Sequence, residues 1–278
     1  SKETAMRHLK PVEILDEIAA SGIAKTSGSF RKLLILGIMA GAYIAFAGAG
    51  ANMAAFGLLG DAETFGLGKL VSGAVFTGGL IMVVLAGAEL FTGNTLITVS
   101  VMQKKTSISK MLRNWVIVYI ANFIGSVIVS ALVFYSGGLN AGNGYLGAMT
   151  LQIAANKVNM PFVNCILSGI LCNWLVCLAV WISTGASGTC GKIAGIFFPI
   201  LLFVVAGYEH SVANMYFISA GIFAKTNELF VALNGAADLS NLTWLGMFTN
   251  NLLPVSIGNI IGGVVFVAMG YMLALKER

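Results

Sequence analysis

The sequence predicts an all-α membrane protein in which six transmembrane helices form two inverted three-helix repeats, with the second and fifth helices broken. Three observations support this fold class. The 278 residues are 58% hydrophobic and only 10% charged, whereas soluble domains carry about 25% charged residues. Six apolar segments each reach the ~20 residues that cross a bilayer core. Two sequence motifs also recur, in the same order, in the two halves of the chain.

The first 32 residues are polar and are predicted to hold one amphipathic helix. Pro11 suits a first helical turn and Gly28 follows the expected end. Its apolar stripe is too short to span, so the helix is either an interfacial anchor or a lid over a cytoplasmic mouth. No apolar core of a cleavable signal peptide is apparent in this region. We therefore divide the chain into residues 1–32, a cytoplasmic N-terminal helix, and residues 33–278, a transmembrane domain.

The six apolar segments lie at about 33–59, 70–102, 111–136, 160–183, 193–224 and 246–275. Polar and small residues interrupt the second segment at 89–95 and the fifth at 207–214, and both segments are long enough for two half-helices. The repeats are expected at about 33–136 and 160–275. The 34 glycines suit helices that pack closely in a membrane.

The distribution of lysine and arginine predicts the orientation. If the N-terminus is inside, 13 of the 16 basic residues fall in inside segments, and only Lys69, Lys157 and Lys225 fall outside. This asymmetry places both termini in the cytoplasm. It also explains the net charge of +5 without a nucleic-acid partner. We expect a multi-pass protein of a bacterial inner membrane, with the lipid bilayer as its surroundings.

Two motifs indicate the internal duplication. The pattern A-G-x-E-x-x-x-x-N occurs at Ala86–Asn94 and at Ala206–Asn214, in the two interrupted segments. The pattern N-x7-N-x-x-G occurs at Asn114–Gly125 and at Asn251–Gly262. Because each half has three spans, the halves must cross the membrane in opposite senses. Paired interruptions in inverted repeats indicate a transport site near the middle of the membrane.

A helix that restarts within the membrane presents free N–H groups and a positive dipole end, which favours an anion. Glu89 and Glu209 occupy equivalent positions at the two breaks. As pathway-lining groups these carboxylates would repel anions. We therefore expect them to accept hydrogen bonds from loop N–H groups and to fix the loops.

His210 is the only histidine in the apolar part of the chain, and it aligns with Leu90 of the other repeat. It is either a satisfied core residue or, as we prefer, a functional group, with Thr92 of the opposite loop as a hydroxyl partner. Burial favours its neutral form and a nearby anion its charged form. Glu209, His210 and Ser211 are adjacent and cannot form a hydrolase triad.

The four cysteines do not form a metal motif, and we expect all of them to be buried and reduced. They are Cys165, Cys172, Cys177 and Cys190. With no metal or cofactor constellation, the sequence does not favour an enzyme, and we expect no cofactor.

The chain closely resembles the formate/nitrite transporter family over nearly its whole length. The resemblance rests on runs such as G-A-E-L-F-T-G-N (Gly87–Asn94), G-Y-E-H-S-V-A-N-M (Gly207–Met215) and N-N-L-L-P-V-S-I-G-N-I-I-G-G (Asn250–Gly263). It implies an aquaporin-like fold, a homopentamer with one pore per protomer, and transport of small monovalent anions of weak acids. These are formate, nitrite, hydrosulfide or, in some members, lactate.

Matched by motif, the resemblance also implies roles for individual residues. His210 is the expected central pore histidine, with Thr92 as its partner. The remaining expected residues are the polar Asn173 and Asn214, Lys157 of the outer vestibule, the constriction residues Phe76, Leu80 and Phe203, and Leu90 and Phe91 on a movable loop. Without the resemblance, Phe76 and Leu80 are an ordinary helical pair, and Lys157 is an ordinary solvated lysine.

The leading hypothesis is therefore a pore in which His210 neutralises a weak-acid anion at an apolar barrier, so that replacement of His210 by asparagine changes selectivity or pH dependence. The alternatives are an aquaporin-like pore for neutral small solutes and a membrane sensor that does not transport. The sequence does not choose among formate, nitrite and hydrosulfide, or between a channel and a proton-coupled carrier.

Overall fold

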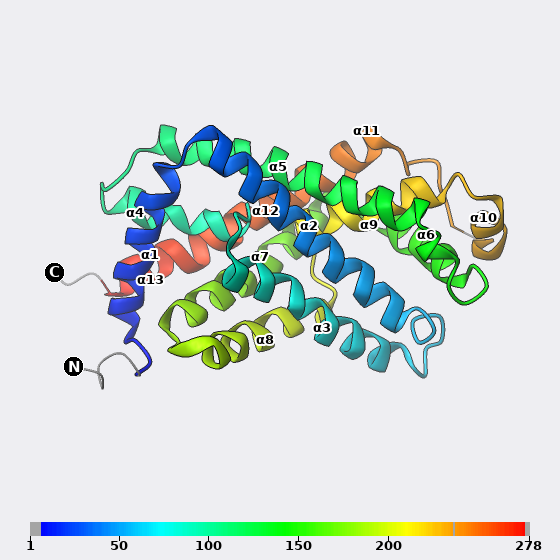
Figure 1. Cartoon of the computed structure of the whole chain (residues 1–278), viewed down its shortest axis with the longest axis horizontal. Helices are drawn as coiled ribbons and strands as arrows, with labels where there is room; N and C mark the ends of the chain where they lie inside the picture. Colours follow the sequence, from blue (N-terminus) through cyan, green and yellow to red (C-terminus); the bar gives the residue numbers. More distant parts are fainter. Residues whose placement is uncertain (1–6, 236, 276–278) are drawn as a thin grey trace.

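The structure is a computed structural model that describes residues 7–235 and 237–275. It is an elongated bundle of helices, and the described residues contain no β-strand (Figure 1). The helices of the first half are α1 (Pro11–Thr26), α2 (Phe30–Ala55), α3 (Phe65–Met82), α4 (Thr98–Met102) and α5 (Ile108–Tyr135). A π-helical turn (Val83–Gly87) extends α3, and a 3-10 segment (Gly93–Ile97) leads into α4.

The second half repeats this order with additional short helices. They are α6 (Tyr145–Val158), α7 (Phe162–Gly185), α8 (Gly188–Ala206), α9 (Ser211–Ala224), α10 (Glu228–Asn234), α11 (Trp244–Gly246), α12 (Leu253–Ile261) and α13 (Gly270–Leu275). Two π-helical segments, Met247–Leu252 and Gly262–Met269, join α11 to α12 and α12 to α13 into one long helix. A short 3-10 turn, Gly138–Asn140, precedes α6.

Within the described residues, six helices are long and apolar enough to cross a membrane, as the sequence predicts. They begin at Phe30, Phe65, Ile108, Phe162, Gly188 and Trp244. Two shorter apolar helices, Gly93–Met102 and Ser211–Ala224, follow the second and fifth of these spans. They are the second halves of the two broken helices, so the predicted positions of both interruptions are confirmed.

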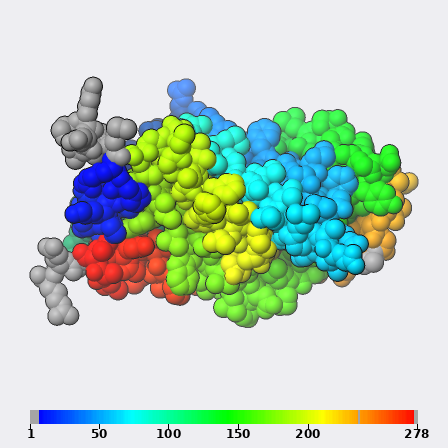
Figure 2. All heavy atoms as spheres, turned by 90° about the horizontal axis from the view of Figure 1, so that it is seen from below, coloured from blue at the N-terminus to red at the C-terminus, as the bar shows by residue number. Residues whose placement is uncertain are grey.

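The expected N-terminal helix forms as α1. Its Glu13 caps the helix start by accepting a hydrogen bond from the Lys10 N–H (2.7 Å). Ile14, Leu15 and Ile18 are buried, and the Leu9 N–H bonds to the Gly185 carbonyl at 2.8 Å. Helix α1 thus packs on the transmembrane helices. It lies at the same end of the molecule as α13, which ends the described chain (Figures 1 and 2).

Helix α6 was not expected, because the sequence analysis assigns no helix between 136 and 160. At 14 residues it is too short to span a bilayer. Its apolar face packs instead on α9 and α10. Leu151 is fully buried there, and Gly147 lies against the ring of Phe230 in α10. The hydropathy of a short, partly polar helix does not separate it from a loop.

The expectation of four buried cysteines is wrong at one position. Cys165, Cys172 and Cys177 are buried, whereas Cys190 is exposed. Cys190 lies in the first turn of α8, before the helix reaches the packed part of the bundle. A small apolar residue in a helix start has no neighbouring helix to cover it there.

Close helix crossings position the two long helices that carry the asparagine motif. Helix α5 crosses α2 so closely that a methyl group at Gly125 would overlap the carbonyl oxygen of Ile38. In the other half, a methyl group at Gly262 would overlap the carbonyl oxygen of Ile170 in α7. The glycine of each N-x7-N-x-x-G motif is therefore a packing residue, as small residues are in membrane helix pairs.

Candidate functional site

Each broken helix stops at a glycine. Gly87 has φ +91° and Gly207 has φ +78°, backbone conformations that glycine adopts without a steric penalty. The chain then runs in extended form, through Ala88 in the first break and up to His210 in the second, before the next helical segment starts. The two A-G-x-E motifs therefore encode the same event, a left-handed glycine followed by a glutamate in an unwound segment.

An asparagine holds each unwound segment in place by the same three hydrogen bonds. Asn122 of α5 accepts from the Phe91 N–H (2.9 Å) and donates to the carbonyls of Gly37 (2.7 Å) and Glu89 (2.9 Å). Its counterpart Asn259 in α12 does the same in the second half. It accepts from the Ser211 N–H (2.9 Å) and donates to the carbonyls of Gly169 (2.8 Å) and Glu209 (3.0 Å).

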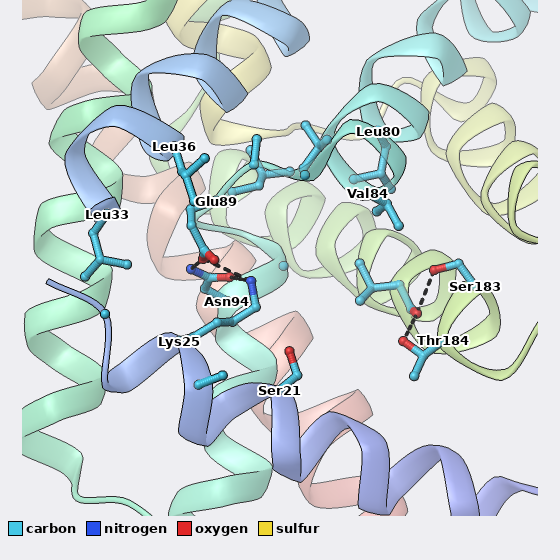
Figure 3. A pocket seen from close by; sticks show the side chains of 18 of the residues that line it. Ser21, Lys25, Leu33, Leu36, Leu80, Val84, Glu89, Asn94, Ser183 and Thr184 are labelled. Carbon is cyan, nitrogen blue, oxygen red and sulfur yellow. Dashed lines mark hydrogen bonds and ion pairs between the residues drawn. The ribbon is translucent and has the colours of Figure 1, made fainter. Parts of the chain in front are cut away.

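The glutamate of the first break forms a cluster with one lysine and two asparagines. Glu89 accepts from the Lys25 ammonium at 2.9 Å and from the Asn94 amide at 2.7 Å. Asn94 also donates to the Asn114 side chain at 2.9 Å, and Asn114 donates to the Lys25 carbonyl at 3.2 Å. Figure 3 shows Lys25, Glu89 and Asn94 converging beside one cavity.

The second break repeats this cluster with equivalent residues. One difference is that Lys25 also donates to the Asn94 side-chain oxygen at 3.0 Å, a bond without a counterpart at Asn214. Lys157 of α6 donates to both carboxylate oxygens of Glu209, at 3.1 and 2.8 Å. Asn214 donates to Glu209 at 2.5 Å and to Asn251 at 2.8 Å, and Asn251 donates to the Lys157 carbonyl at 3.0 Å. Helices α1 and α6 therefore occupy equivalent places in the two halves.

These clusters correct one expectation. We expected loop N–H groups to bond to Glu89 and Glu209, but their donors in the structure are lysine and asparagine side chains. The loop N–H groups of Phe91 and Ser211 bond instead to Asn122 and Asn259. A compact loop cannot turn its N–H groups toward its own carboxylate and also toward the long helix behind it.

His210 joins the two breaks. Its Nδ1 accepts a hydrogen bond from the Ala213 N–H (2.9 Å) and so caps the start of α9. Its Nε2 lies 2.8 Å from the hydroxyl of Thr92 in the other break. Because Nδ1 is an acceptor, Nε2 must carry the proton of a neutral ring, and it donates to Thr92. An imidazolium would lose the cap, because Nδ1–H would face the Ala213 N–H.

Asn173 of α7 supports this junction from behind. It is fully buried, and its amide donates to the carbonyls of Thr92 (3.2 Å) and Asn259 (2.6 Å) and to the hydroxyl of Thr95 (3.2 Å). It therefore links the first break to Asn259, the asparagine that holds the second break in place. Asn173 is absent from the lining of the cavities described below.

One large cavity lies beside each lysine–glutamate cluster, and a small cavity reaches His210. We name them outer and inner after the orientation that the charge distribution predicts. The outer one, of about 970 Å³, is lined by Lys69, Lys157 and Glu209 among others. A smaller cavity of about 120 Å³ continues from it to Phe76, Phe203 and His210. On the other side of the junction lies the inner cavity of about 470 Å³, which Figure 3 shows with Leu80, Val84 and Glu89 in its wall.

Apolar side chains separate these cavities. The rings of Phe76 and Phe203 meet edge to face at 5.7 Å, and Phe203 stacks on the His210 ring at 5.9 Å. Leu80 and Leu90 line the inner cavity. Phe91, the second residue expected on the movable loop and in the constriction, does not line these cavities, because it packs edge to face on Tyr119 at 4.9 Å. It anchors the loop to α5.

Lys25, Asn52 and Lys69 all line cavities, although the sequence predicts no site role for them and Lys69 enters only through the charge distribution. The equivalence of Lys25 and Lys157 gives no signal in the sequence, because Lys157 lies in the unpredicted α6. Asn114 and Asn251 appeared only as marks of the repeat. In the described residues, no group of three or more histidine, cysteine, aspartate or glutamate side chains could hold a metal ion.

Comparisons with known proteins agree with this geometry. Residues 12–273 match the family described as formate/nitrite transporter. An uncharacterised transporter, YrhG, of Bacillus subtilis is 40% identical over 276 residues, which cover 98% of this chain and 96% of the relative. A probable formate transporter of Methanothermobacter thermautotrophicus is 41% identical over 276 residues, covering 93% of this chain and 95% of the relative.

A solved structure has the same fold. It is described as a pentameric formate channel with formate bound, and it matches with a TM-score of 0.79 and 34% sequence identity. The match covers 89% of this chain and 98% of that one.

Proposed function

Because this chain belongs to the formate/nitrite transporter family, we propose that it forms a transmembrane pore for small monovalent weak-acid anions, with formate as its principal substrate. The names of the probable formate transporter and of the solved formate channel support formate. Nitrite and hydrosulfide are also compact and monovalent, and we include them in the proposed range.

The observation that carries this proposal is the hydrogen bond between His210 and Thr92. It lies where two unwound segments meet, with Phe76 and Phe203 beside it and Leu80 and Leu90 toward the inner cavity. A bare anion in such surroundings is very unfavourable. The imidazole Nε2–H and the Thr92 hydroxyl are polar hydrogens at the barrier, available to an oxygen or sulfur atom that replaces their mutual bond.

A weak acid can pass this barrier in its protonated, neutral form, and its anion is drawn to the vestibules by their lysines. His210 then acts as a neutral hydrogen-bond donor, since its cap on α9 favours the neutral ring. Flux should rise as the pH falls toward the pKa of the permeating acid. Chloride has no protonated form at these pH values and should be rejected.

We propose supporting roles for the other residues. Asn173 positions Thr92, and Phe91 fixes the first break to α5. Glu209 and Asn214 hold the second break to Lys157, while Glu89 holds the first to Lys25. These contacts keep the His210 imidazole and the Thr92 hydroxyl within hydrogen-bond distance of each other.

We also propose a homopentamer in a bacterial inner membrane with both termini cytoplasmic. The solved relative is pentameric, and the outer faces of the helices carry exposed side chains such as Leu132 and Phe198 for lipid or neighbouring subunits. Residues 33–278 form the channel domain in this proposal. The lysine of α1 completes its first repeat, so residues 1–32 are part of the working unit.

The test is flux into proteoliposomes for formate, nitrite, hydrosulfide and chloride between pH 5 and 7.5, for the wild type, His210→Asn and His210→Leu. Asparagine caps a helix well and offers an amide donor, so His210→Asn should still pass weak acids, with altered selectivity. His210→Leu loses cap and donor and should lose at least nine-tenths of the flux.

Two outcomes contradict the proposal. Comparable chloride and formate flux in the wild type would indicate an ordinary anion channel, and flux of glycerol or water without any anion flux would favour the neutral-solute pore. If His210→Asn is stable but no longer responds to pH, the histidine acts as an ionised proton donor and the neutral-donor role is wrong.

A further inference from the structure

We propose that Lys69 and Asn52 form a binding subsite for a compact planar anion in the small cavity outside the phenylalanine barrier. The inference rests on the proposed anion pore. It assigns the first binding of the anion on the outer side, called here the capture step, to residues other than Lys157. Three independent observations carry it, namely the charge balance of the outer vestibule, the position of Lys69 and the unsatisfied amide of Asn52.

The charge balance singles out Lys69. Of the two lysines that line the outer cavities, Lys157 has its charge matched by Glu209, with which it forms two bonds. Lys69 has neither an ion pair nor a side-chain hydrogen bond to any residue within 7–235 or 237–275. Asp61 also lines the outer vestibule, but it is exposed and accepts from the Glu63 N–H in its own loop. Asp61 is absent from the small cavity at the inner end of this vestibule, so the uncompensated positive charge there resides on Lys69.

The position of Lys69 places this charge on the path. Lys69 lines both the outer vestibule and the small cavity, so it lies at the passage between them. Ser72 and Phe76 follow it on the same face of α3, three and seven residues later, and line the same small cavity. An anion moving inward therefore meets an ammonium, then a hydroxyl, then the aromatic barrier and His210.

Asn52 supplies a second donor from a different helix. It belongs to α2, lines the small cavity and is only 5% exposed. Its Nδ2 is buried and lacks a hydrogen-bond acceptor among the described residues. A buried amide without an acceptor costs free energy, and an anion in the cavity would supply one. The Asn52 amide is therefore satisfied only when a hydrogen-bond acceptor occupies this cavity.

The cavity and its donors fit a particular ligand. Its volume of about 120 Å³ is several times the ~30 Å³ that a water molecule occupies in the liquid, so an anion of three heavy atoms fits. Two donors on separate helices suit an anion with two acceptor atoms, such as formate or nitrite. Chloride and hydrosulfide can accept several hydrogen bonds but only at one atom, so they bridge two separated donors less well.

The experiment measures formate influx against external formate concentration in right-side-out vesicles at low ionic strength. The variants are Lys69→Met, Lys69→Arg and Asn52→Ala, with Lys105→Met as a charge-matched control, because Lys105 is exposed and absent from the lining of the cavities described here. Lys69→Met should raise the half-saturation concentration about tenfold, the lower end of the effect of a focused charge. Lys69→Arg should keep the half-saturation concentration close to the wild-type value, and Asn52→Ala should raise that concentration about threefold.

High salt should reduce the difference between the wild type and Lys69→Met, because salt screens the charge. Hydrosulfide influx should respond to Lys69→Met but not to Asn52→Ala. Pentamer elution and thermal stability show whether each variant is folded. If Lys69→Met matches the wild type while formate flux persists, the subsite is wrong and the proposed pore stands. A folded wild type without any anion flux would overturn both.

Discussion

Asn122 shows how much of this fold depends on a single side chain. One amide accepts from the Phe91 N–H and donates to two carbonyls, those of Gly37 and Glu89. No other standard side chain of this size has a donor and an acceptor in one plane. The residue is fully buried, so each lost bond leaves an unpaired backbone group away from water.

We therefore predict different effects for two replacements of Asn122. Asn122→Ala should destabilise the protein by about 3 kcal/mol, because it leaves a buried N–H and two carbonyls unpaired. Asn122→Asp should destabilise it more, because a carboxylate would face the same two carbonyls. Thermal unfolding in detergent measures both, with Ser126→Ala, which removes one bond to Gly41 on the same helix face, as the milder control. Equal losses of stability in Asn122→Ala and Asn122→Asp would contradict the role of Asn122 in holding the unwound segment.

At this scale the sequence predicts types of residue better than their partners. The motif positions of Glu89, Glu209, Thr92 and His210 were correctly placed at the breaks. Lys157 is expected in the outer vestibule, but its pairing with Glu209 and that of Lys25 with Glu89 are not predicted. Two transmembrane helices separate Lys25 from Glu89, and two others separate Lys157 from Glu209. The separations are 64 and 52 residues, so no common spacing appears. An ion pair between distant elements becomes visible only once the helices are packed.

Among the elements, α1 combines buried contacts to its neighbours with a charged cluster at its own N-terminus. The Arg7 guanidinium bonds to Glu13 at 2.9 Å, and with the Lys10 N–H it lowers the pKa of that carboxyl from its ordinary 4.5 to about 2. A lowered pKa stabilises the folded helix above pH 4.5, and this stabilisation is lost as the pH falls through 2.

Amide hydrogen exchange of the first turn of α1 tests this dependence. Protection in the wild type should be constant from pH 7 to 5 and, after correction for the intrinsic exchange rate, should decrease between pH 4.5 and 2. Glu13→Gln should lack this step, because glutamine does not titrate. A decrease of the same size in Glu13→Gln would assign the pH response to another group.

The long helices α2 and α5 are capped by Ser29 and Ser107 and also depend on close contact with each other. Helix α5 approaches α2 at Gly125, where a methyl group would overlap the Ile38 carbonyl oxygen. Gly78 in α3 is helical too, but a methyl group there would meet no atom within 4 Å. The two glycines thus separate a packing role from helix propensity.

Gly125→Ala should destabilise the protein by about 1–3 kcal/mol through overpacking. Gly78→Ala should stabilise it by up to about 1 kcal/mol, since alanine has the higher helix propensity. Unfolding temperatures in detergent give both signs. A loss of stability in both variants would mean that Gly78 lies in a contact between subunits.

Considered as a whole, the molecule has two halves that repeat even their hydrogen bonds, and the sequence motifs predict that duplication and its inversion. They do not predict α6, whose place in the repeat is that of α1. Helices α1 and α6 each carry a lysine in the last turn, Lys25 and Lys157, but otherwise they share little sequence. Because α6 is held by tertiary contacts such as Leu151 rather than by hydropathy, a pattern of apolar residues cannot reveal it.

The orientation of the whole molecule follows from its charge distribution and can be tested with its own cysteines. Cys190 is exposed, whereas the other three are buried, and the segment before α8 is predicted to be cytoplasmic. A membrane-impermeant maleimide should therefore label one thiol in inverted membrane vesicles and none in right-side-out vesicles. Cys190→Ser should abolish the label.

Adding Asp61→Cys to Cys190→Ser reverses the expected sidedness, because exposed Asp61 lies in the loop between α2 and α3, which is predicted to be outside. This double variant should be labelled only in right-side-out vesicles. If Cys190 reacts from the outside instead, both termini are outside, and the cavity that holds Lys69 opens to the cytoplasm. The capture step assigned to that lysine would then serve export rather than uptake.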